Sequence, residues 1–351
     1  MPELGAVIFV CRNKSMKVKL GDVCERGTSN LRQSDVVGKG GDYPIYGASG
    51  YIGDVDFYHQ EKSYVAIVKD GAGIGRTMLC PEKSSVIGTM QYLLPKDAIL
   101  PQYLYYVVKY MHLEKYFSGA TIPHIYFKDY KNEQFNLDTL KKQAIIVKIL
   151  GKCEEVIAAR NKQLNALDEL IQARFVEMFG DPVINSKNLR TMALKDVLRL
   201  KAGDFTAASD ISDKLTETNK YPCFGGNGIR GYVTEYNQEG EYSLIGRQGA
   251  LSGNVQFAKG KFRNTEHALL VIPMVEMNDI WLNQLLINLD LKRYQTGAAQ
   301  PGLSVKNLQE ISIIMVPITE QNQFAGFVNQ VNKSKLVIKN LLQIYKHQIQ
   351  M

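Results

Sequence analysis

The side chains best suited to chemistry in this sequence are hydrogen-bonding residues in glycine-rich segments, and that chemistry is the reading of base edges. Arginine matches the two acceptors of guanine, and asparagine or glutamine matches the donor and acceptor of adenine. Candidate DNA contacts in the second half are Asn227, Arg230, Arg247, Gln248, Arg263, Asn264, Gln300 and Lys306. Those in the first half are Ser49, Lys69, Arg76, His124 and Lys128, of which Lys128 aligns with Lys306 as a candidate phosphate contact. Each residue alone could equally be a solvated loop residue, so which of them touch bases stays open.

Catalytic chemistry is not predicted by any set of residues in the sequence. The five histidines form no H-x-x-x-H pair, and Gly151-Lys152 lacks the upstream glycine of a phosphate-binding loop. The run Gly71–Gly75 has the wrong spacing for a dinucleotide loop and predicts a tight turn between strands. We therefore expect a non-catalytic chain, with no catalytic residues, no metal site and no cofactor of its own. A nucleic-acid-acting enzyme with an unrecognised site is kept as an alternative.

The candidate residues belong to a unit that is written twice. The segment 43–53 recurs as 221–231, so Tyr43 and Tyr221 differ by 178 positions. The same offset, without a gap, places 116–128 on 294–306 and Gln143 on Gln321. A period of this length indicates a duplicated domain rather than a short stacked repeat.

Each copy has the same predicted order of elements. Apolar runs at 64–68 and 242–245 predict strands, and patches at 103–113 and 281–291 predict helices. Long helices are predicted from about 138 to 179 and from about 319 to the end. Their heptad-spaced apolar residues predict a coiled-coil seam, although a helix packed only on its own domain is the alternative. The seam residues are Leu150, Ile157, Leu164, Ile171 and Met178 in the first helix and Val328, Val331, Ile338, Leu342, Tyr345 and Ile349 in the second.

The predicted fold class is α+β. Two tandem pseudo-symmetric α/β domains are each followed by a long helix, and the helices pair as an antiparallel coiled coil, which would place the domains at its opposite ends. Residues 1–15 have no counterpart in the second copy, so native starts at Met1 and at Met16 both stay open. The predicted boundaries are an N-terminal extension at 1–15, a first domain at 16–136, a first long helix at 137–180, a linker at 181–190, a second domain at 191–316 and a second long helix at 317–351.

Composition is compatible with a cytoplasmic protein that binds a polyanion. The net charge is +7, which suits nucleic acid without establishing it. The five cysteines are scattered and include no C-x-x-C pair, which argues against disulfides and zinc. Apolar runs are too short for a membrane span, so we expect no membrane association.

Taken in order, these motifs resemble the specificity subunits of type I restriction–modification systems. The resemblance rests on the glycine triplets 47/50/53 and 225/228/231, Arg247-Gln-Gly249, Gly297-Ala-Ala-Gln-Pro-Gly-Leu-Ser304 and Pro317-Ile-Thr-Glu-Gln321. The first copy departs from the pattern, with Thr121-Ile-Pro-His-Ile125 in place of the Gln-Pro-x-Leu-Ser form. Such variation is expected if the two domains read different sequences.

The resemblance implies a division of labour with partner subunits. Each target-recognition domain reads half of a split double-stranded DNA target, and the helices act as spacer and docking surface. Two modification subunits methylate adenine and use S-adenosylmethionine. Restriction subunits cut the DNA and use ATP and Mg²⁺. The target sequence and the spacer length stay open, as does the alternative of a non-expressed, recombinable specificity allele.

Overall fold

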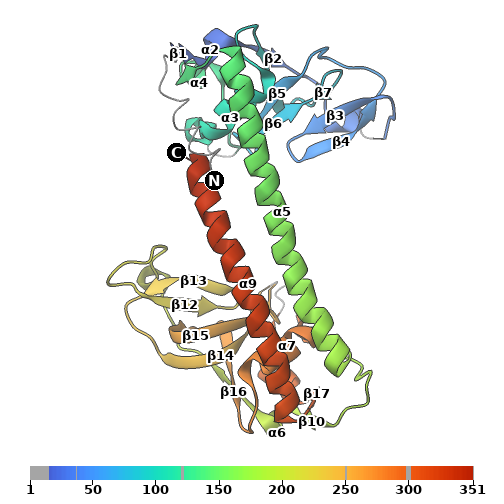
Figure 1. The fold of residues 1–351 in the computed structure, drawn as a ribbon, viewed down its shortest axis with the longest axis vertical. Coiled ribbons are helices and arrows are strands. Elements are labelled where there is room, and N and C mark those ends of the chain that lie inside the picture. The colour runs from blue at the N-terminus through green and yellow to red at the C-terminus, as the bar shows by residue number, and fades with distance from the viewer. Residues whose placement is uncertain (1–15, 37, 120–121, 250, 298–301, 351) are drawn as a thin grey trace. The chain divides into compact units, whose positions relative to one another are not determined.

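The computed structural model describes residues 16–350 apart from 37, 120–121, 250 and 298–301 (Figure 1). The predicted extension at 1–15 and the candidate Gln300 therefore lie outside the described residues. The chain divides between Val156 and Ile157 into two compact units, called unit 1 and unit 2 below. None of the helices in the described ranges is long and apolar enough to cross a membrane.

Unit 1 is built from small sheets that lead into a helical region. Strand β1 (Met16–Lys19) pairs antiparallel with β9 (Gln134–Leu137). A four-stranded sheet has the order β2 (Cys24–Thr28), β8 (Met90–Pro95), β5 (Tyr64–Val68), β6 (Thr77–Cys80), and a three-stranded sheet has the order β4 (Gly50–Val55), β3 (Tyr43–Gly47), β7 (Ser85–Val86). The helices are α2 (Leu20–Val23), α3 (Pro101–Tyr110), α4 (Phe127–Tyr130) and the start of α5 (Leu140–Phe179), with 3₁₀ turns η1 (Gln33–Asp35) and η2 (Leu113–Tyr116).

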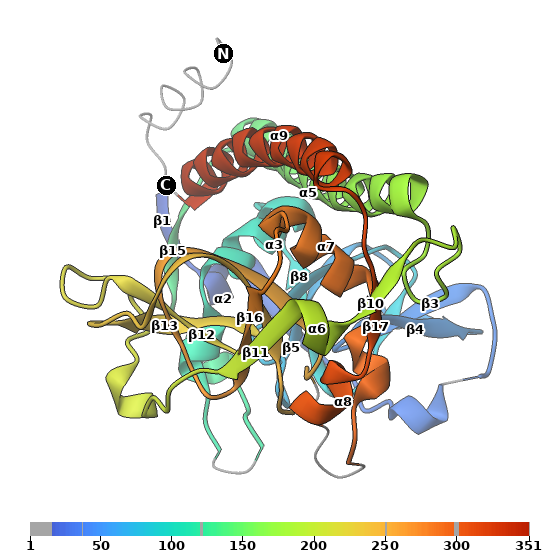
Figure 2. The same ribbon diagram turned by 90° about the horizontal axis from the view of Figure 1, so that it is seen from below.

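Unit 2 repeats this order. Residues 194–202 are offset by 174 positions from residues 20–28 of α2 and β2, and Tyr221 lies at the predicted offset of 178 from Tyr43, the first residue of β3. Strand β10 (Thr191–Ala193) pairs with β17 (Ser312–Ile314). One six-stranded sheet has the order β11 (Leu198–Ala202), β16 (Ala268–Pro273), β14 (Gln238–Gly246), β15 (Val255–Asn264), β12 (Tyr221–Gly225), β13 (Gly228–Val233). The helices are α6 (Leu194–Val197), α7 (Asp279–Asn288), α8 (Val305–Gln309) and α9 (Ile318–Gln350), with 3₁₀ turns η3 (Ala208–Asp210) and η4 (Leu291–Tyr294). Helix α7 packs between α9 and strands β14 and β15 (Figure 2).

The two copies differ in how one strand runs. In unit 2, β15 is continuous over ten residues, and it pairs antiparallel with β14 and then parallel with β12. Unit 1 has Pro81 where unit 2 has Lys259, and Lys83 takes a positive φ of 51°. Because proline cannot donate a ladder hydrogen bond, the strand breaks there into β6 and β7. One sheet in unit 2 therefore corresponds to two sheets in unit 1.

A buried glutamine ties the first turn of each long helix to its domain. Gln143 is 0% exposed, and its amide nitrogen donates to the carbonyls of Asp138 and Ala98 at 2.8 and 2.9 Å. Its oxygen accepts from the Leu100 N–H, at the start of α3, at 2.8 Å. Gln321 does the same in unit 2, donating to Val316 and accepting from Asn278 at the start of α7. The repeated glutamine therefore fixes two helix starts against each other in each copy.

Helices α5 and α9 contact each other within unit 2 and run antiparallel there. The rings of Phe175 and Phe324 have centroids 5.5 Å apart, and the Arg174 guanidinium lies over the Phe327 ring. Farther along, Lys335 bonds to Asp168, so the residue number rises on one helix as it falls on the other. This bears out the expected antiparallel contact.

The predicted seam lies partly inside one apolar core. Ile171, Val328 and Val331 belong to a buried cluster of unit 2 that also contains Trp281. Met178 is partly buried and packs against the same cluster. A seam role for the remaining predicted residues stays a prediction; they are Leu150, Ile157, Leu164, Ile338, Leu342, Tyr345 and Ile349.

Replacing Gln321 by leucine is expected to lower the free energy of unfolding by about 2–4 kcal/mol, because the part-buried Asn278 N–H and the buried Val316 carbonyl lose their partners. Urea unfolding followed by the fluorescence of Trp281, the single tryptophan, reports on unit 2. Gln323→Leu, at an exposed position two residues on, is the matched control and should change stability by less than about 0.5 kcal/mol. Equal losses in the two variants would contradict the anchoring role.

Replacing Phe175 by alanine is expected to cost about 3–5 kcal/mol, because this 0% exposed ring packs on both Phe179 and Phe324. The same Trp281 fluorescence measures the loss. The neighbouring Val176 is 45% exposed, so Val176→Ala should be nearly neutral. A similar stability for both variants would show that the contact between the helices contributes little.

Candidate nucleic-acid interface

Three loops of unit 2 converge, and they carry most of the candidate base-reading residues. The tip of the β12–β13 hairpin meets the β14–β15 loop where Asn254 Nδ2 donates to Asn227 Oδ1 at 2.9 Å. The segment before α8 joins them because the Leu303 N–H donates to the Arg247 carbonyl at 2.9 Å. Gln248 also forms an isolated β-bridge with Gly302. Segments far apart in the sequence thus build one surface.

Glycine is required where the first two loops touch. A Cβ on Gly246 would lie 2.2 Å from the carbonyl oxygen of Gly226, a distance that no side chain tolerates. A Cβ on Gly226 would in turn lie 3.1 Å from the carbonyl oxygen of His267. These glycines allow the hairpin tip to approach the β14–β15 loop closely.

Unit 1 has the same arrangement with different side chains. Arg76, at the position of Asn254, donates through Nη1 to the Ala48 carbonyl of the β3–β4 hairpin at 3.0 Å. The Ile125 N–H donates to the Lys69 carbonyl at 2.9 Å, as Leu303 does to Arg247. The backbone frame is therefore shared, and the groups that it displays differ.

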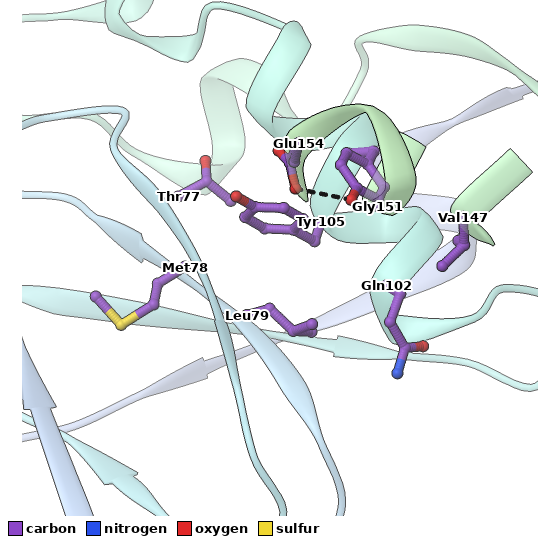
Figure 3. Close-up of a pocket in the computed structure, with 9 residues that line it drawn as sticks. Thr77, Met78, Leu79, Gln102, Tyr105, Val147, Gly151 and Glu154 are labelled. Carbon is purple, nitrogen blue, oxygen red and sulfur yellow. Dashed lines mark hydrogen bonds between the residues drawn. The ribbon is translucent and has the colours of Figure 1, made fainter. Parts of the chain in front are cut away.

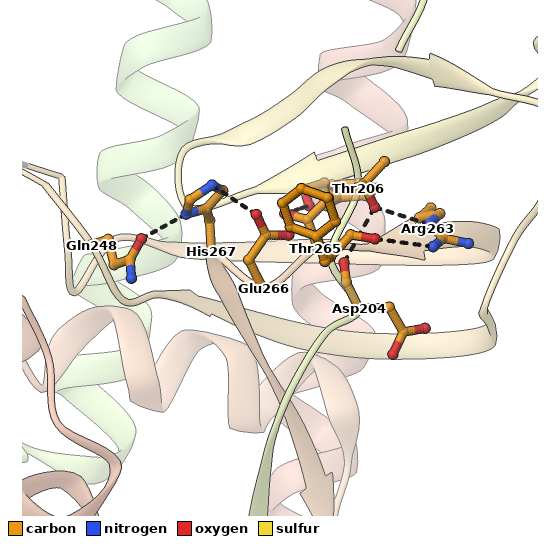
Figure 4. A network of polar contacts seen from close by, with 9 residues as sticks. Asp204, Thr206, Gln248, Arg263, Thr265, Glu266 and His267 are labelled. Atoms are coloured by element: carbon orange, nitrogen blue, oxygen red, sulfur yellow. Dashed lines mark hydrogen bonds and ion pairs between the residues drawn. The ribbon is translucent and has the colours of Figure 1, made fainter. Parts of the chain in front are cut away.

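In each unit a histidine side chain contacts the residue that follows Lys69 or Arg247, but the two histidines belong to different loops. In unit 1, Nδ1 of His124 lies 2.6 Å from Oδ1 of Asp70. In unit 2 the position of Asp70 is taken by Gln248, whose Oε1 lies 2.7 Å from Nδ1 of His267 (Figure 4). His267 is not at the position of His124, which corresponds to Gly302. Nε2 of His267 lies 3.1 Å from Oε1 of Glu266.

The candidate residues differ in how accessible they are. Asn264 is 0% exposed, its Nδ2 donates to the Ala268 carbonyl at 3.4 Å, and it is not proposed below as a contact. Arg263 is half-buried and donates through Nε to Thr206 Oγ1 at 3.0 Å (Figure 4). The other described candidates are exposed or half-buried, namely Ser49, Lys69, Arg76, His124, Lys128, Asn227, Arg230, Arg247, Gln248 and Lys306.

Charged side chains surround Cys223 on strand β12 of the unit 2 hairpin. Burial raises the pKa of the Cys223 thiol on β12, while the positive charges of Arg230 and Arg263 act to lower it. Glu266 acts on the same thiol in the opposite sense. Two guanidinium groups and one carboxylate therefore lie near this strand. In unit 1 a further cation is placed where the Lys128 ammonium lies 5.3 Å from the centre of the Tyr126 ring.

Sequence reasoning missed several residues of this surface. Asp70 and Asn254 could have been found, because they align with the candidates Gln248 and Arg76 at the offset of 178. Nothing in the sequence pointed to His267 or Glu266, because the corresponding residues of unit 1, Thr89 and Gly88, have no titratable side chain.

An open pocket of about 440 Å³ lies elsewhere in unit 1, between β6, α3 and α5 (Figure 3). Tyr106 donates to Glu154 across its wall at 2.9 Å, and Lys109 bonds to the same carboxylate at 2.6 Å. Burial and hydrogen bonding to Glu154 both raise the pKa of Tyr106. None of the candidate DNA contacts lines this pocket; its lining residues are Thr77, Met78, Leu79, Gln102, Tyr105, Tyr106, Val147, Gly151 and Glu154.

Comparison with known protein families matches each half of the chain to the same family model. The type I restriction modification DNA specificity domain matches residues 13–169 and again residues 186–344. The type I restriction enzyme EcoprrI specificity subunit of Escherichia coli is 37% identical over 204 residues, which cover 55% of this chain and 49% of that protein. A putative specificity subunit of Haemophilus influenzae is 29% identical over 126 residues, 35% of this chain and 33% of that one. The matched part thus spans half or less of these two relatives.

Solved structures agree on the fold. A type I restriction–modification S subunit from M. genitalium superposes with a TM-score of 0.61 over 97% of this chain and 96% of its own, at 16% identity. A second structure, from a study of type I complex assembly and conformational transition, gives a TM-score of 0.54 over 96% of this chain and 97% of its own, also at 16% identity. With its duplicated domain matched in both halves, the chain belongs to the type I restriction–modification DNA specificity family.

Proposed function

We propose that this chain is the DNA-reading subunit of a type I restriction–modification enzyme, and that each unit reads one half of a bipartite target. The observation that carries the proposal is the repeated frame of three converging loops, which displays Lys69, Asp70 and His124 in unit 1 but Arg247 and Gln248 in unit 2. Different groups on one frame suit two half-sites of different sequence. The net charge of +7 suits a polyanionic partner.

The exposed candidates are proposed to divide into phosphate and base contacts. Lys128 and Lys306 are both exposed, on α4 and at the start of α8, and are proposed to bind phosphates. The groups proposed to face bases lie in the converging loops or, for Arg230, on the adjoining strand β13, and are Ser49, Lys69, Arg76, His124, Asn227, Arg230, Arg247 and Gln248. Arg263, which is tied to Thr206, and Gln300 are kept as further proposed contacts.

Methylation and cleavage are proposed to be the work of partner subunits. Two modification subunits would bring S-adenosylmethionine, and restriction subunits would bring ATP and Mg²⁺. The long helices are proposed to serve as docking surface and spacer, with domain boundaries as predicted from the sequence. Helix α5 has 40 residues, which corresponds to about 60 Å at 1.5 Å per residue. Such a length suits half-sites more than one turn of DNA apart.

Sequencing the methylated bases of a host with and without this chain tests the proposal. With the modification subunits present, a bipartite adenine motif should appear only when the chain is expressed. Methylation or cleavage by the purified chain alone would favour an enzyme with an unrecognised site. An expressed chain that binds no DNA and changes no methylation would overturn the proposal, and absence of the protein from its native host would identify a silent allele.

Lys306→Ala is expected to weaken binding to all sequences alike and to reduce the slope of log affinity against log salt by about 1, because one phosphate contact is lost. Titrations of the specific duplex at several salt concentrations measure the slope. Lys148→Ala, at an exposed position on α5, removes the same charge outside the converging loops and should leave the slope unchanged. Equal slopes for wild type and Lys306→Ala would contradict the phosphate role.

A further inference from the structure

The imidazole of His267 sits between two side chains that both present oxygen. Its Nε2 lies 3.1 Å from Oε1 of Glu266, and its Nδ1 lies 2.7 Å from Oε1 of Gln248 (Figure 4). An ionised carboxylate only accepts hydrogen bonds, so Glu266 requires a proton on Nε2. The amide of Gln248 can meet Nδ1 with either its oxygen or its nitrogen. The proton count of the ring therefore decides which end of the amide faces it.

Two arrangements follow from this constraint. When the ring is an imidazolium, Nδ1–H donates to the amide oxygen of Gln248, and the structure places that oxygen 2.7 Å from Nδ1. When the ring is neutral, Glu266 keeps the proton on Nε2, and the bare Nδ1 accepts from the amide nitrogen of Gln248. The amide turns over between the two states. Its outer edge offers a donor and an acceptor in both, but in opposite order.

That order matters for reading a base. Adenine offers an acceptor at N7 beside a donor at N6, so only one order of the glutamine amide pairs with both. We propose that Gln248 is a specificity-determining residue of unit 2 and that His267 is its positioning residue, setting the order of donor and acceptor that Gln248 presents. This inference rests on the proposed function, because it assigns Gln248 to a base edge.

The surroundings of the ring keep this coupling local. The Arg247 N–H donates to the His267 carbonyl at 3.0 Å, so a backbone hydrogen bond joins the segments that carry the side chains of Gln248 and His267. Gln248 is exposed and His267 is half-buried, which leaves the amide reachable by a ligand. Arg247 and Glu266 adjoin Gln248 and His267 in the sequence, and Arg230 and Arg263 act together with Glu266 on Cys223 of β12.

Unit 1 provides the internal contrast. There the partner of the histidine is Asp70, which cannot turn over to present a donor. Its carboxylate requires a proton on Nδ1 of His124 at any pH at which it is ionised. Asp70 of unit 1 therefore has a fixed hydrogen-bonding pattern, whereas the pattern of Gln248 in unit 2 depends on the protonation of the His267 ring.

The test uses the full chain with its modification subunits and duplexes of the bipartite motif that methylome sequencing identifies. Gln248→Leu should relax the base preference at one position of one half-site by about tenfold and leave the other half-site unchanged. In the wild type, that preference should change by about tenfold between about pH 5 and pH 8, the general range in which histidines change charge. His267→Asn should retain the motif and lose the change with pH.

Glu266→Gln is the matched control for the proton argument. Its amide can donate to Nε2, so a neutral ring can keep its proton on Nδ1 and the pH dependence should shrink. A purely structural role for His267 predicts lower stability with an unchanged pH profile, which Trp281 fluorescence and the duplex titrations separate.

The two proposals fail in different ways. If the wild-type complex recognises no bipartite motif, the proposed function fails. If it recognises one, but Gln248→Leu leaves every position unchanged or the wild-type preference does not vary with pH, the assignment of Gln248 and His267 is overturned.

Discussion

The buried side-chain amides of Gln143 and Gln321 are the interaction on which the remaining architecture depends. Each joins a carbonyl just before a long helix to the N–H of the residue that caps a shorter helix, and each glutamine side chain is itself buried. Because an unpaired buried amide is costly, both helix starts are held in one geometry. The shorter helix packs on the sheet in each unit, so the sheet and the long helix are positioned by the same contact. The positions of the loops at the strand ends follow from the position of the sheet.

The converging loops of the two units share a backbone arrangement and carry different side chains. Two of the three loops are joined by hydrogen bonds between main-chain groups, from Ile125 to Lys69 in unit 1 and from Leu303 to Arg247 in unit 2. Such bonds do not depend on which side chain a residue carries. Side chains at the loop surface can therefore change without moving the loops, as the exchange of Asp70 for Gln248 illustrates. This separation of frame from display is what a protein that recognises two different half-sites requires.

The sequence predicted features that the backbone imposes. Glycines and prolines restrict the main chain, so their recurrence at a fixed offset correctly indicated two copies with the same strands and helices. It did not predict that β15 is continuous where unit 1 has two strands, because the effect of Pro81 depends on which strands flank it. The burial of Asn264 was also missed. Asparagine in a loop-like segment suggests exposure, and only the parallel pairing of β12 with the end of β15 places it inside.

The contacts of His124 and His267 show why comparison of the two copies does not find every residue of such a surface. The Arg247 N–H donates to the His267 carbonyl, and the Lys69 N–H donates to the Thr89 carbonyl, so residues 89 and 267 occupy equivalent places. Only one of them carries an imidazole, and unit 1 supplies its own from His124, on another loop. Once loops converge, a side chain on any of them can reach the same point. Equivalence in the frame therefore does not imply equivalence in function, and the groups that distinguish the two units have to be found in space rather than along the repeat.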